Sequence, residues 1–142
     1  MISKKSIIIE NISRSNDSRG EILSIVDDKA RNVSIITCNV GSIRSNHYHL
    51  EDYHYMYVLE GEMDYFFRDI ETDKVNYLKI KKSQNVFTPP MEIHATYFPI
   101  KTKLIVTSRN PRDRDTYEKD TVRVDFLNND NIRDFLQKYA TK

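Results

Sequence analysis

Eight short segments rich in β-branched and aromatic residues run through most of the chain, and this pattern constrains the fold most. The segments are 22–28, 33–40, 53–60, 62–69, 75–80, 85–90, 94–100 and 103–108. Turn signals such as DSRG, LEGE, ETDK, KKSQ and PP separate them. Residues of these types favour strands, and many short strands at even spacing are typical of an all-β sandwich or barrel. We therefore expect an all-β fold.

Three local patterns predict how the chain connects and how it ends. Segment 58–67 is predicted to form a hairpin around Gly61, since glycine adopts positive φ in tight turns. Segment 67–78 is predicted to form a second hairpin that turns near Asp73 and Lys74. A short amphipathic helix is expected at about 129–140, packed on the strands. Its apolar residues recur at i, i+3, i+4 and i+7, namely Ile132, Phe135, Leu136 and Tyr139.

All four histidines of the chain lie in two short stretches, 41–62 and 87–98. Within the first stretch, His47 and His49 are two residues apart, so they point to the same face of a strand. His54 begins the next predicted strand, and a tight turn would bring it beside this pair. The spacing indicates a site built from imidazoles, which bind metals and also transfer protons.

The spacing resembles the two sequence motifs of the cupin superfamily, over roughly residues 33–108. The first motif runs glycine, five residues, His-x-His, three or four residues, glutamate, six residues, glycine. The chain matches it at Gly41, His47, His49 and Gly61, with His54 at the glutamate position. The second motif is matched by Pro89 and His94, while Met91 and Phe98 replace its glycine and asparagine.

The resemblance implies a cupin-type jelly-roll β-barrel, with the whole chain, 1–142, as a single cupin domain. It also implies one divalent metal ion inside the barrel, such as Zn, Fe, Ni or Mn. The ligands carried across would be His47, His49, His54 and His94. Some cupins are metal-free and use the same histidines as proton-transfer bases. Whether these histidines act as ligands or as bases therefore stays open.

Further stretches resemble cupins that act on sugar nucleotides, including rhamnose-pathway epimerases and thymidine-diphosphate-sugar ketoisomerases. NDSRGEILSI, at 16–25, is similar to their D-x-R-G-x-aliphatic opening, and IRSNHYH, at 43–49, is similar to a segment of the ketoisomerases and of capsule-synthesis cupins. In the second segment Ser45 replaces a glycine. Arginine forks near residue 110 would suit a diphosphate, although nearby acidic residues would also pair with them in a solvated loop. The expected substrate-binding residues are Arg19, Arg44, Tyr57, Arg109 and Arg112.

The resemblance predicts an isomerase or epimerase of a nucleotide-linked keto sugar in surface polysaccharide biosynthesis. Such an enzyme needs a base and a group that stabilises an enolate. His49 is the expected base, Glu92 a possible second base, and Tyr97 a group that returns the proton. The alternatives are a mononuclear Fe(II) dioxygenase acting on a diketone-like substrate, and a non-catalytic cupin that binds a sugar or a metal.

Composition indicates which binding partners and which cell compartment to expect for this protein. The formal net charge is +1, and we find no basic motif typical of nucleic-acid binding. No apolar stretch approaches the ~20 residues of a membrane span. The only cysteine, Cys38, lies in a predicted buried strand and fits a reducing cytoplasm. We also expect a homodimer, formed through an outer sheet surface that carries Tyr55, Tyr57, Tyr65 and Phe67.

Overall fold

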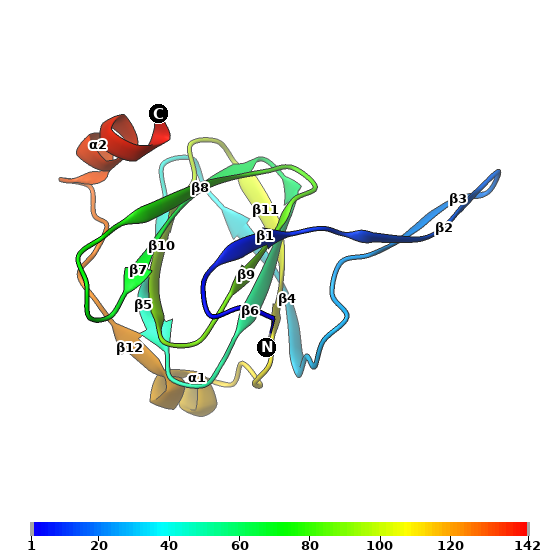
Figure 1. Ribbon diagram of the computed structural model, residues 1–142, viewed down its shortest axis with the longest axis horizontal. Helices are drawn as coiled ribbons and strands as arrows, with labels where there is room; N and C mark the ends of the chain where they lie inside the picture. Colours follow the sequence, from blue (N-terminus) through cyan, green and yellow to red (C-terminus); the bar gives the residue numbers. More distant parts are fainter. Residues whose placement is uncertain (1, 142) are drawn as a thin grey trace.

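Two five-stranded antiparallel sheets form the body of the protein, and a two-stranded hairpin projects from it (Figure 1). The computed structural model describes residues 2–141. The first sheet has the strand order β1-β9-β6-β11-β4, and the second has the order β12-β5-β10-β7-β8. The strands are β1 (Ile7–Ile9), β2 (Ile12–Asp17), β3 (Gly20–Ser24), β4 (Asn32–Cys38), β5 (Ile43–His49), β6 (His54–Glu60), β7 (Glu62–Asp69), β8 (Asn76–Lys81), β9 (Asn85–Thr88), β10 (Glu92–Tyr97), β11 (Thr102–Ser108) and β12 (Thr121–Arg123).

The path of the chain from β4 to β11 is that of a jelly roll. Every connection in this part passes from one sheet to the other, except the one between β7 and β8. Within residues 2–141 no strand of the first sheet pairs with a strand of the second, so the two sheets face each other without closing into a continuous barrel. The predicted all-β, cupin-type jelly-roll fold is confirmed.

The two predicted hairpins have different outcomes. Strands β7 and β8 pair with each other, as expected for segment 67–78. Strands β6 and β7 do not form a hairpin, because β6 pairs with β11 in the first sheet and β7 pairs with β10 in the second. Gly61 does have a positive φ of 91°. Its conformation serves a connection that crosses between the sheets, which local sequence cannot distinguish from a hairpin turn.

The apolar core lies between the two sheets, and a second apolar layer covers the outer face of the second sheet. Cys38 is in the inner core and fully buried, as predicted. The outer layer includes the predicted C-terminal helix, which consists of α2 (Ile132–Phe135) followed by a π-helical turn, Leu136–Ala140. The ring of Phe135 packs 5.6 Å from that of Phe66 on β7. No helix within residues 2–141 has the length and apolar character needed to cross a membrane.

The aromatic surface predicted to form a dimer does not exist as one face. Tyr65 and Phe67 point into the core between the sheets and are 0% and 6% exposed. Tyr55 faces the opposite side of β6, where it packs in a cluster under the N-terminal segments and donates a hydrogen bond to Asp28. The predicted interface was wrong because β6 and β7 belong to different sheets, so their aromatic side chains do not form one surface.

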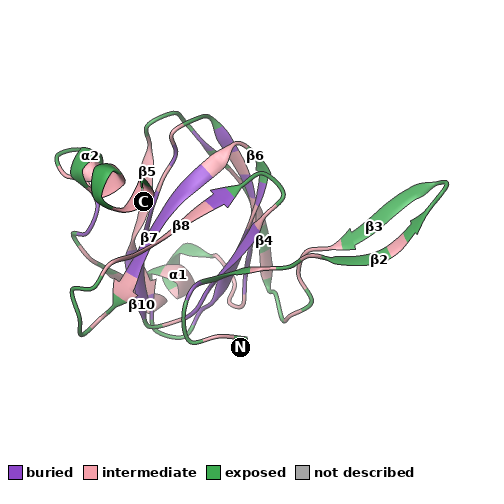
Figure 2. Cartoon of the chain, turned by 45° about the horizontal axis from the view of Figure 1, so that its top comes forward, coloured by how far each residue is buried: buried purple, intermediate pink, exposed green. Residues whose placement is uncertain are grey.

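The hairpin of β2 and β3 extends away from the two sheets as an arm (Figure 1). Figure 2 shows that most of this arm is exposed. Ile22 is 64% exposed on the arm, and Val33 and Ile35 are 66% and 69% exposed on β4 at the edge of the first sheet. The second sheet is covered by the C-terminal helix, whereas these apolar residues remain open to solvent.

Candidate functional site

The four histidines converge between the two sheets. His47 and His49 lie on β5, His54 begins β6 and His94 lies on β10, and each is at most 6% exposed. Pairing of β10 with β5 places His94 opposite His47. The ring centroids of His47 and His49 are 4.6 Å apart, those of His47 and His94 are 4.8 Å apart, and those of His49 and His54 are 4.6 Å apart.

The backbone of β5 is irregular just before the histidines. Ser45 and Asn46 have positive φ values of 72° and 58°, and the pairing with β10 shifts register next to His94. A register shift of this kind redirects the side chains that follow it. The side chain of Asn46 holds the irregular segment by hydrogen bonds with the backbone of Leu127. Positive φ at Ser45 also explains why glycine suits this position in the proteins that the segment resembles.

Hydrogen bonds fix the orientation of three of the four rings. Nδ1 of His49 lies 3.3 Å from Oγ1 of Thr121, and Nε2 of His54 lies 3.0 Å from a carboxylate oxygen of Asp52. Nδ1 of His94 lies 3.2 Å from the backbone oxygen of Glu92. Each ring therefore keeps one nitrogen for other partners.

A short helix after the last jelly-roll strand supplies part of this support. Helix α1 (Arg114–Asp120) begins at Asp113, whose side chain accepts a hydrogen bond from the backbone of Thr116. At its end the carboxylate of Asp120 accepts hydrogen bonds from the backbone nitrogens of Glu51 and Asp52. The helix thereby ties the turn between β5 and β6 to strand β12.

Burial favours the neutral form of His47, His49 and His94. Burial, followed by the neighbouring histidines His94 and His54, lowers the pKa of His47 to about 2. Burial lowers the pKa of His94 to about 4 and also lowers that of His49. Neutral imidazoles carry a free lone pair, so these side chains can accept a proton or bind a cation.

A cavity of about 260 Å³ lies beside the histidines, between the two sheets. His47 and His54 form part of its wall, together with Arg44, Arg112 and Arg123. Its apolar lining comes from Ile36, Ile43, Met56, Phe98, Leu104 and Val106. The remaining lining residues are Ser45, Thr96 and Tyr117. The cavity therefore combines cationic, apolar and imidazole surfaces.

Arg112 lines the cavity, and one nitrogen of its guanidinium group has no partner among residues 2–141. Its guanidinium carbon lies 5.0 Å from the centroid of the Tyr117 ring, in a cation–π contact. Its Nη1 atom is buried and has no hydrogen-bond partner among residues 2–141. A buried donor without a partner is unfavourable, so an anionic or carbonyl oxygen bound here would satisfy it.

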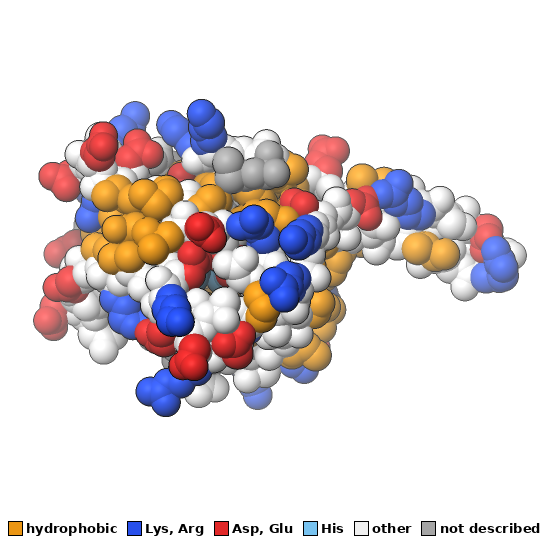
Figure 3. Space-filling model, turned by 90° about the horizontal axis from the view of Figure 1, so that it is seen from below, with side chains coloured by type: hydrophobic (Ala, Val, Ile, Leu, Met, Phe, Trp, Pro, Cys, Tyr) orange, Lys and Arg blue, Asp and Glu red, His pale blue; other side chains and the backbone are white. Residues whose placement is uncertain are grey.

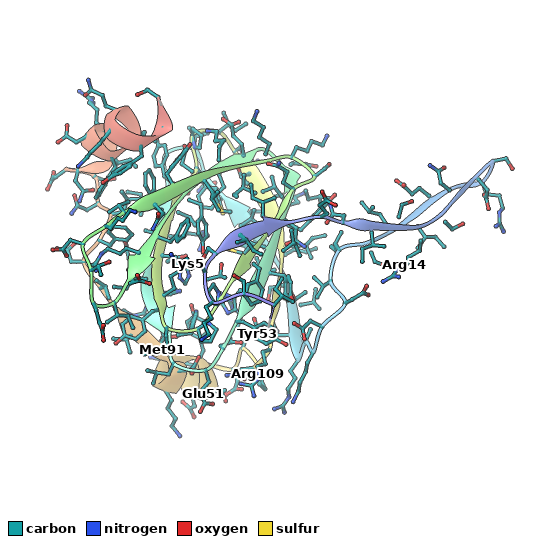
Figure 4. All side chains as sticks on the ribbon, in the orientation of Figure 1. Lys5, Arg14, Glu51, Tyr53, Met91 and Arg109 are labelled. Atoms are coloured by element: carbon teal, nitrogen blue, oxygen red, sulfur yellow. The ribbon has the colours of Figure 1, made fainter. Side chains whose placement is uncertain are left out.

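Several residues predicted for the site lie elsewhere. The side chain of Arg19 is 86% exposed on the arm and pairs with Asp17. Arg109 donates a hydrogen bond to the backbone oxygen of Glu51 outside the cavity, and Figure 4 shows the two at the lower end of the molecule. Tyr57 is half-buried on β6 and does not line the cavity. Arg19 is far from the cavity because the arm projects from the two sheets (Figure 1), and Tyr57 faces away from it because residues alternate along β6.

The two other catalytic candidates are also engaged outside the cavity. Tyr97 packs in the layer under the C-terminal helix, because it alternates with the inward-facing His94 and Thr96 along β10. Glu92 is buried, and its carboxylate accepts hydrogen bonds from the backbone nitrogen and hydroxyl of Ser6. Burial raises the pKa of Glu92, but its partner is the N-terminal segment rather than a group in the cavity.

Sequence reasoning missed several groups around the histidines. They are Asp52, Tyr117, Asp120, Thr121 and Arg123. Only Asp52 had a local signal, since it stands two residues before His54 in the turn between two predicted strands. The other four lie after β11 in the sequence. They come close to the histidines because β12 pairs with β5. Figure 3 shows the acidic and basic side chains that gather on the lower end of the molecule.

The histidines fit a metal ion as a group of three. Ring nitrogens of His47, His49 and His94 lie within 4.8 Å of one another. Nδ1 of His47 and Nε2 of His49 are buried and have no hydrogen-bond partner among residues 2–141. Because buried polar atoms usually have a partner, these two nitrogens are available to bind a ligand. The predicted fourth ligand, His54, is not in this group, and its Nε2 atom is bonded to Asp52.

Comparison with known proteins relates the chain to enzymes of surface polysaccharide synthesis. Residues 15–121 match the family described as "Polysaccharide biosynthesis C-terminal domain". No curated protein matches the sequence. The QdtA 3,4-ketoisomerase of Thermoanaerobacterium thermosaccharolyticum, a double mutant with bound TDP, superposes with a TM-score of 0.69 at 18% identity. This match covers 97% of the chain and 99% of QdtA.

Three more solved structures show the same fold. Another QdtA mutant, with TDP-4-keto-6-deoxyglucose bound, has a TM-score of 0.68 at 16% identity and covers 96% of this chain and 97% of that one. WlaRA of Campylobacter jejuni, a TDP-fucose-3,4-ketoisomerase, has a TM-score of 0.64 at 17% identity, covering 83% and 87%. CapF of Staphylococcus aureus, a capsular polysaccharide assembling protein, has a TM-score of 0.63 at 18% identity. The match to CapF covers 83% of this chain but 33% of CapF.

Proposed function

Because the chain belongs to the polysaccharide biosynthesis C-terminal domain family, we propose that it is an isomerase of a nucleotide-linked keto sugar. The reaction would move the ketone between neighbouring carbons of the sugar. The observation that carries this proposal is the cluster of four buried histidines beside a cavity whose wall carries His47, His54 and three arginines. Burial lowers the pKa of His47 and of His94, which keeps their imidazoles neutral. The structural likeness to sugar 3,4-ketoisomerases supports the same reaction class.

The chemistry of ketone migration matches what these residues offer. A hydrogen must leave the carbon next to the ketone, and an enediolate forms before a hydrogen returns to the former carbonyl carbon. This sequence needs a base that is unprotonated at neutral pH and surroundings that stabilise the enediolate. Neutral histidines supply the base, and the cationic groups of Arg112 and Arg123 favour the negative charge of the intermediate.

The lining of the cavity supports a nucleotide sugar as the substrate class. Arginine side chains bind diphosphates through paired hydrogen bonds, and the buried Nη1 atom of Arg112 is free for such a bond. The apolar part of the cavity would accept a deoxygenated sugar carbon or a base. We propose the cytoplasm as the compartment, since the one cysteine, Cys38, is a buried free thiol.

Hydrogen exchange tests the proposal directly. The protein would be incubated in deuterated water with TDP-4-keto-6-deoxyglucose, and with its uridine counterpart as a second probe. Deuterium should enter the sugar carbon next to the ketone, even where net conversion is slight, because the proton on the base exchanges with solvent before it returns to the sugar. Mass spectrometry and NMR of the sugar measure this incorporation. If neither probe exchanges faster than in protein-free solution, the isomerase proposal is wrong.

We also propose that His47, His49 and His94 hold one divalent ion, such as Zn, Fe, Ni or Mn. Support comes from the proximity of their nitrogens and from the two that have no partner. Neutral imidazoles suit these ions, and a bound ion would polarise the ketone as a Lewis acid. Elemental analysis of protein purified without chelator should give one ion per chain. Bound iron, together with oxygen uptake on a diketone and no exchange of keto sugars, would favour the dioxygenase alternative.

A homodimer remains our proposal, but with a different interface from the one predicted. The arm carries the exposed Ile12, Ile22 and Leu23, and the edge strand β4 carries the exposed Val33 and Ile35. An isolated two-stranded hairpin is marginally stable in water, so the arm needs a surface to pack on. A second copy supplies an apolar surface of the same kind, since both the arm and the edge strand occur in every chain.

A further inference from the structure

We infer that His54, oriented by Asp52, is the catalytic residue that carries the proton between the sugar carbons. This inference rests on the proposed function and assigns the proton transfer within it to one pair of side chains. His54 is not a member of the group of three histidines that fits a metal ion, although its ring packs on that of His49 with 4.6 Å between the centroids.

The geometry of His54 is that of an oriented base. Its Nε2 atom lies 3.0 Å from a carboxylate oxygen of Asp52, and the side chains of the two residues are 6% and 5% exposed. A carboxylate accepts hydrogen bonds, so this contact places the ring proton on Nε2. Nδ1 is then the unprotonated nitrogen, and it has no hydrogen-bond partner within residues 2–141. Since His54 lies on the cavity wall, this nitrogen is available to a bound substrate.

The carboxylate of Asp52 is itself held in place. One of its oxygens accepts a hydrogen bond of 3.0 Å from the backbone nitrogen of Asn110, and the other faces His54. The backbone nitrogen of Asp52 donates to Asp120. Within the described residues, Asp52 forms no salt bridge with lysine or arginine. Its charge is therefore directed at the imidazole, where it stabilises the imidazolium that forms when His54 takes a proton.

The other titratable side chains are less suited to this step. His47, His49 and His94 present nitrogens to one another, in the arrangement that fits an ion. The carboxylate of Glu92 is occupied by Ser6, away from the cavity wall. Among the histidines that line the cavity, His54 is the one whose ring is bonded to a carboxylate at hydrogen-bond distance.

The step balances without any further reactant. Nδ1 of His54 removes the hydrogen, as a proton, from the hydroxyl-bearing carbon next to the ketone. The electron pair of that C–H bond forms a carbon–carbon double bond, and the ketone oxygen takes the negative charge. The imidazolium then returns the proton to the former ketone carbon, and the hydroxyl proton moves from one sugar oxygen to the other. Substrate and product have the same atoms and the same overall oxidation state.

Two variants and a matched control test the inference. His54→Gln keeps a polar side chain that can bond Asp52 but cannot carry a proton. Asp52→Asn keeps the shape and removes the charge. Asp64→Asn is the control, because Asp64 is equally buried but bonds Tyr77 and Lys79 on the second sheet, outside the cavity lining. Circular dichroism and thermal melting give the folded fraction of each variant, to which all rates are normalised.

The first readout is deuterium exchange into TDP-4-keto-6-deoxyglucose. His54→Gln should lower the exchange rate by about 10²–10⁴-fold, the usual contribution of a general base. Asp52→Asn should lower kcat by at least about 10-fold with little change in KM, since Asp52 acts on the transition state through His54. Asp64→Asn should retain the wild-type rate per folded molecule. Exchange that persists in His54→Gln would overturn the inference while the isomerase proposal stands.

The second readout does not depend on activity. Long-range ¹H–¹⁵N NMR of histidine-labelled protein reports which ring nitrogen of His54 carries the proton. We expect the proton on Nε2 in the wild type and in Asp64→Asn, and a changed or mixed state in Asp52→Asn. A proton on Nδ1 in the wild type would overturn the inference, because the nitrogen available to substrate would then be blocked. Absence of exchange by the wild type would instead overturn the proposed function and this inference with it.

Discussion

Nδ1 of His49 lies 3.3 Å from Oγ1 of Thr121, and this contact decides which nitrogen of the His49 ring stays free. The hydroxyl of Thr121 donates its own proton to the backbone oxygen of Tyr117, at 2.6 Å. It can therefore only accept from His49, which places the ring proton on Nδ1. Nε2 is left unprotonated, buried and without a partner among residues 2–141, ready to accept a proton or to bind an ion.

Replacing His49 by Asn should abolish deuterium exchange into keto sugars, with a loss of at least about 100-fold. The free Nε2 atom disappears, and with it one proposed ligand of the ion that polarises the ketone. Thr121→Val should give a smaller loss, because the ring remains but its tautomer is no longer fixed. The measurement is the exchange rate per folded molecule, followed by mass spectrometry. An unchanged rate in His49→Asn would contradict a role for the histidine cluster in the reaction.

Arg112→Ala should raise KM for a nucleotide sugar while leaving kcat closer to the wild-type value. A contact with a remote phosphate binds ground and transition states alike, so its loss weakens binding without slowing the chemical step. Arg109→Ala is the matched control, because Arg109 is three residues away but lies outside the cavity lining. Steady-state kinetics of both variants give the comparison. An equal rise in KM for the two would place the nucleotide outside this cavity.

Gly61→Ala should destabilise the protein more than Gly41→Ala does. Both glycines have positive φ, 91° and 80°, where an L-residue costs about 1–2 kcal/mol. A Cβ atom on Gly61 would also lie 2.6 Å from the backbone oxygen of Lys101 and 2.8 Å from Cα of Thr102, whereas Gly41 has open space. This overpacking adds about 1–3 kcal/mol. Urea unfolding measures both, and equal midpoints would show that the crossing at Gly61 is not tightly packed.

The metal-free protein should lose stability as the pH falls from about 6.5 towards 4. Folding lowers the pKa of His94 from 6.5 to about 4, and that of His47 to about 2, chiefly through burial. The unfolded chain therefore binds more protons than the folded chain in this range. The stability due to neutral His94 is complete above pH 6.5 and declines by up to ~1.4 kcal/mol per pH unit below it.

Thermal melting of chelator-treated protein at a series of pH values checks this dependence. His94→Gln should flatten the acid limb of the melting curve, because a neutral amide has no proton to gain. Glu92, whose pKa is raised by burial, acts in the opposite direction at the acid end. A melting temperature that does not change between about pH 7 and pH 5 would contradict the buried, neutral state of the histidines.

Changing Ile22 and Leu23 on the arm to serine should convert a dimer into a monomer. Both side chains are exposed in the single chain, and their burial against a second copy would supply apolar contact area. Ile100→Ser is the control, since Ile100 is also exposed, at 47%, but lies in the turn between β10 and β11. Analytical ultracentrifugation gives the masses. A wild-type monomer at micromolar concentration would contradict the proposed interface.

The sequence determined the fold class and the residues that form the centre of the site. Period-two alternation in short β-rich segments predicts strands because only one face of each strand reaches the core. The same alternation placed His47 and His49 on one face, and motif spacing added His94 and His54. The C-terminal helix was predicted from its 3.6-residue period, because one apolar stripe must pack against the sheets.

Only the tertiary structure decided which strands pair and which polar groups surround the histidines. A glycine turn looks the same in a hairpin and in a crossing between sheets, so the pairing of β6 with β11 instead of β7 had no local signal. Asp120 and Thr121 are about seventy residues from His49 in sequence, and reach it because β12 pairs with β5. The orientation of His54 towards Asp52 depends on three-dimensional packing, since sequence position sets the face of a side chain but not the hydrogen bonds of its ring.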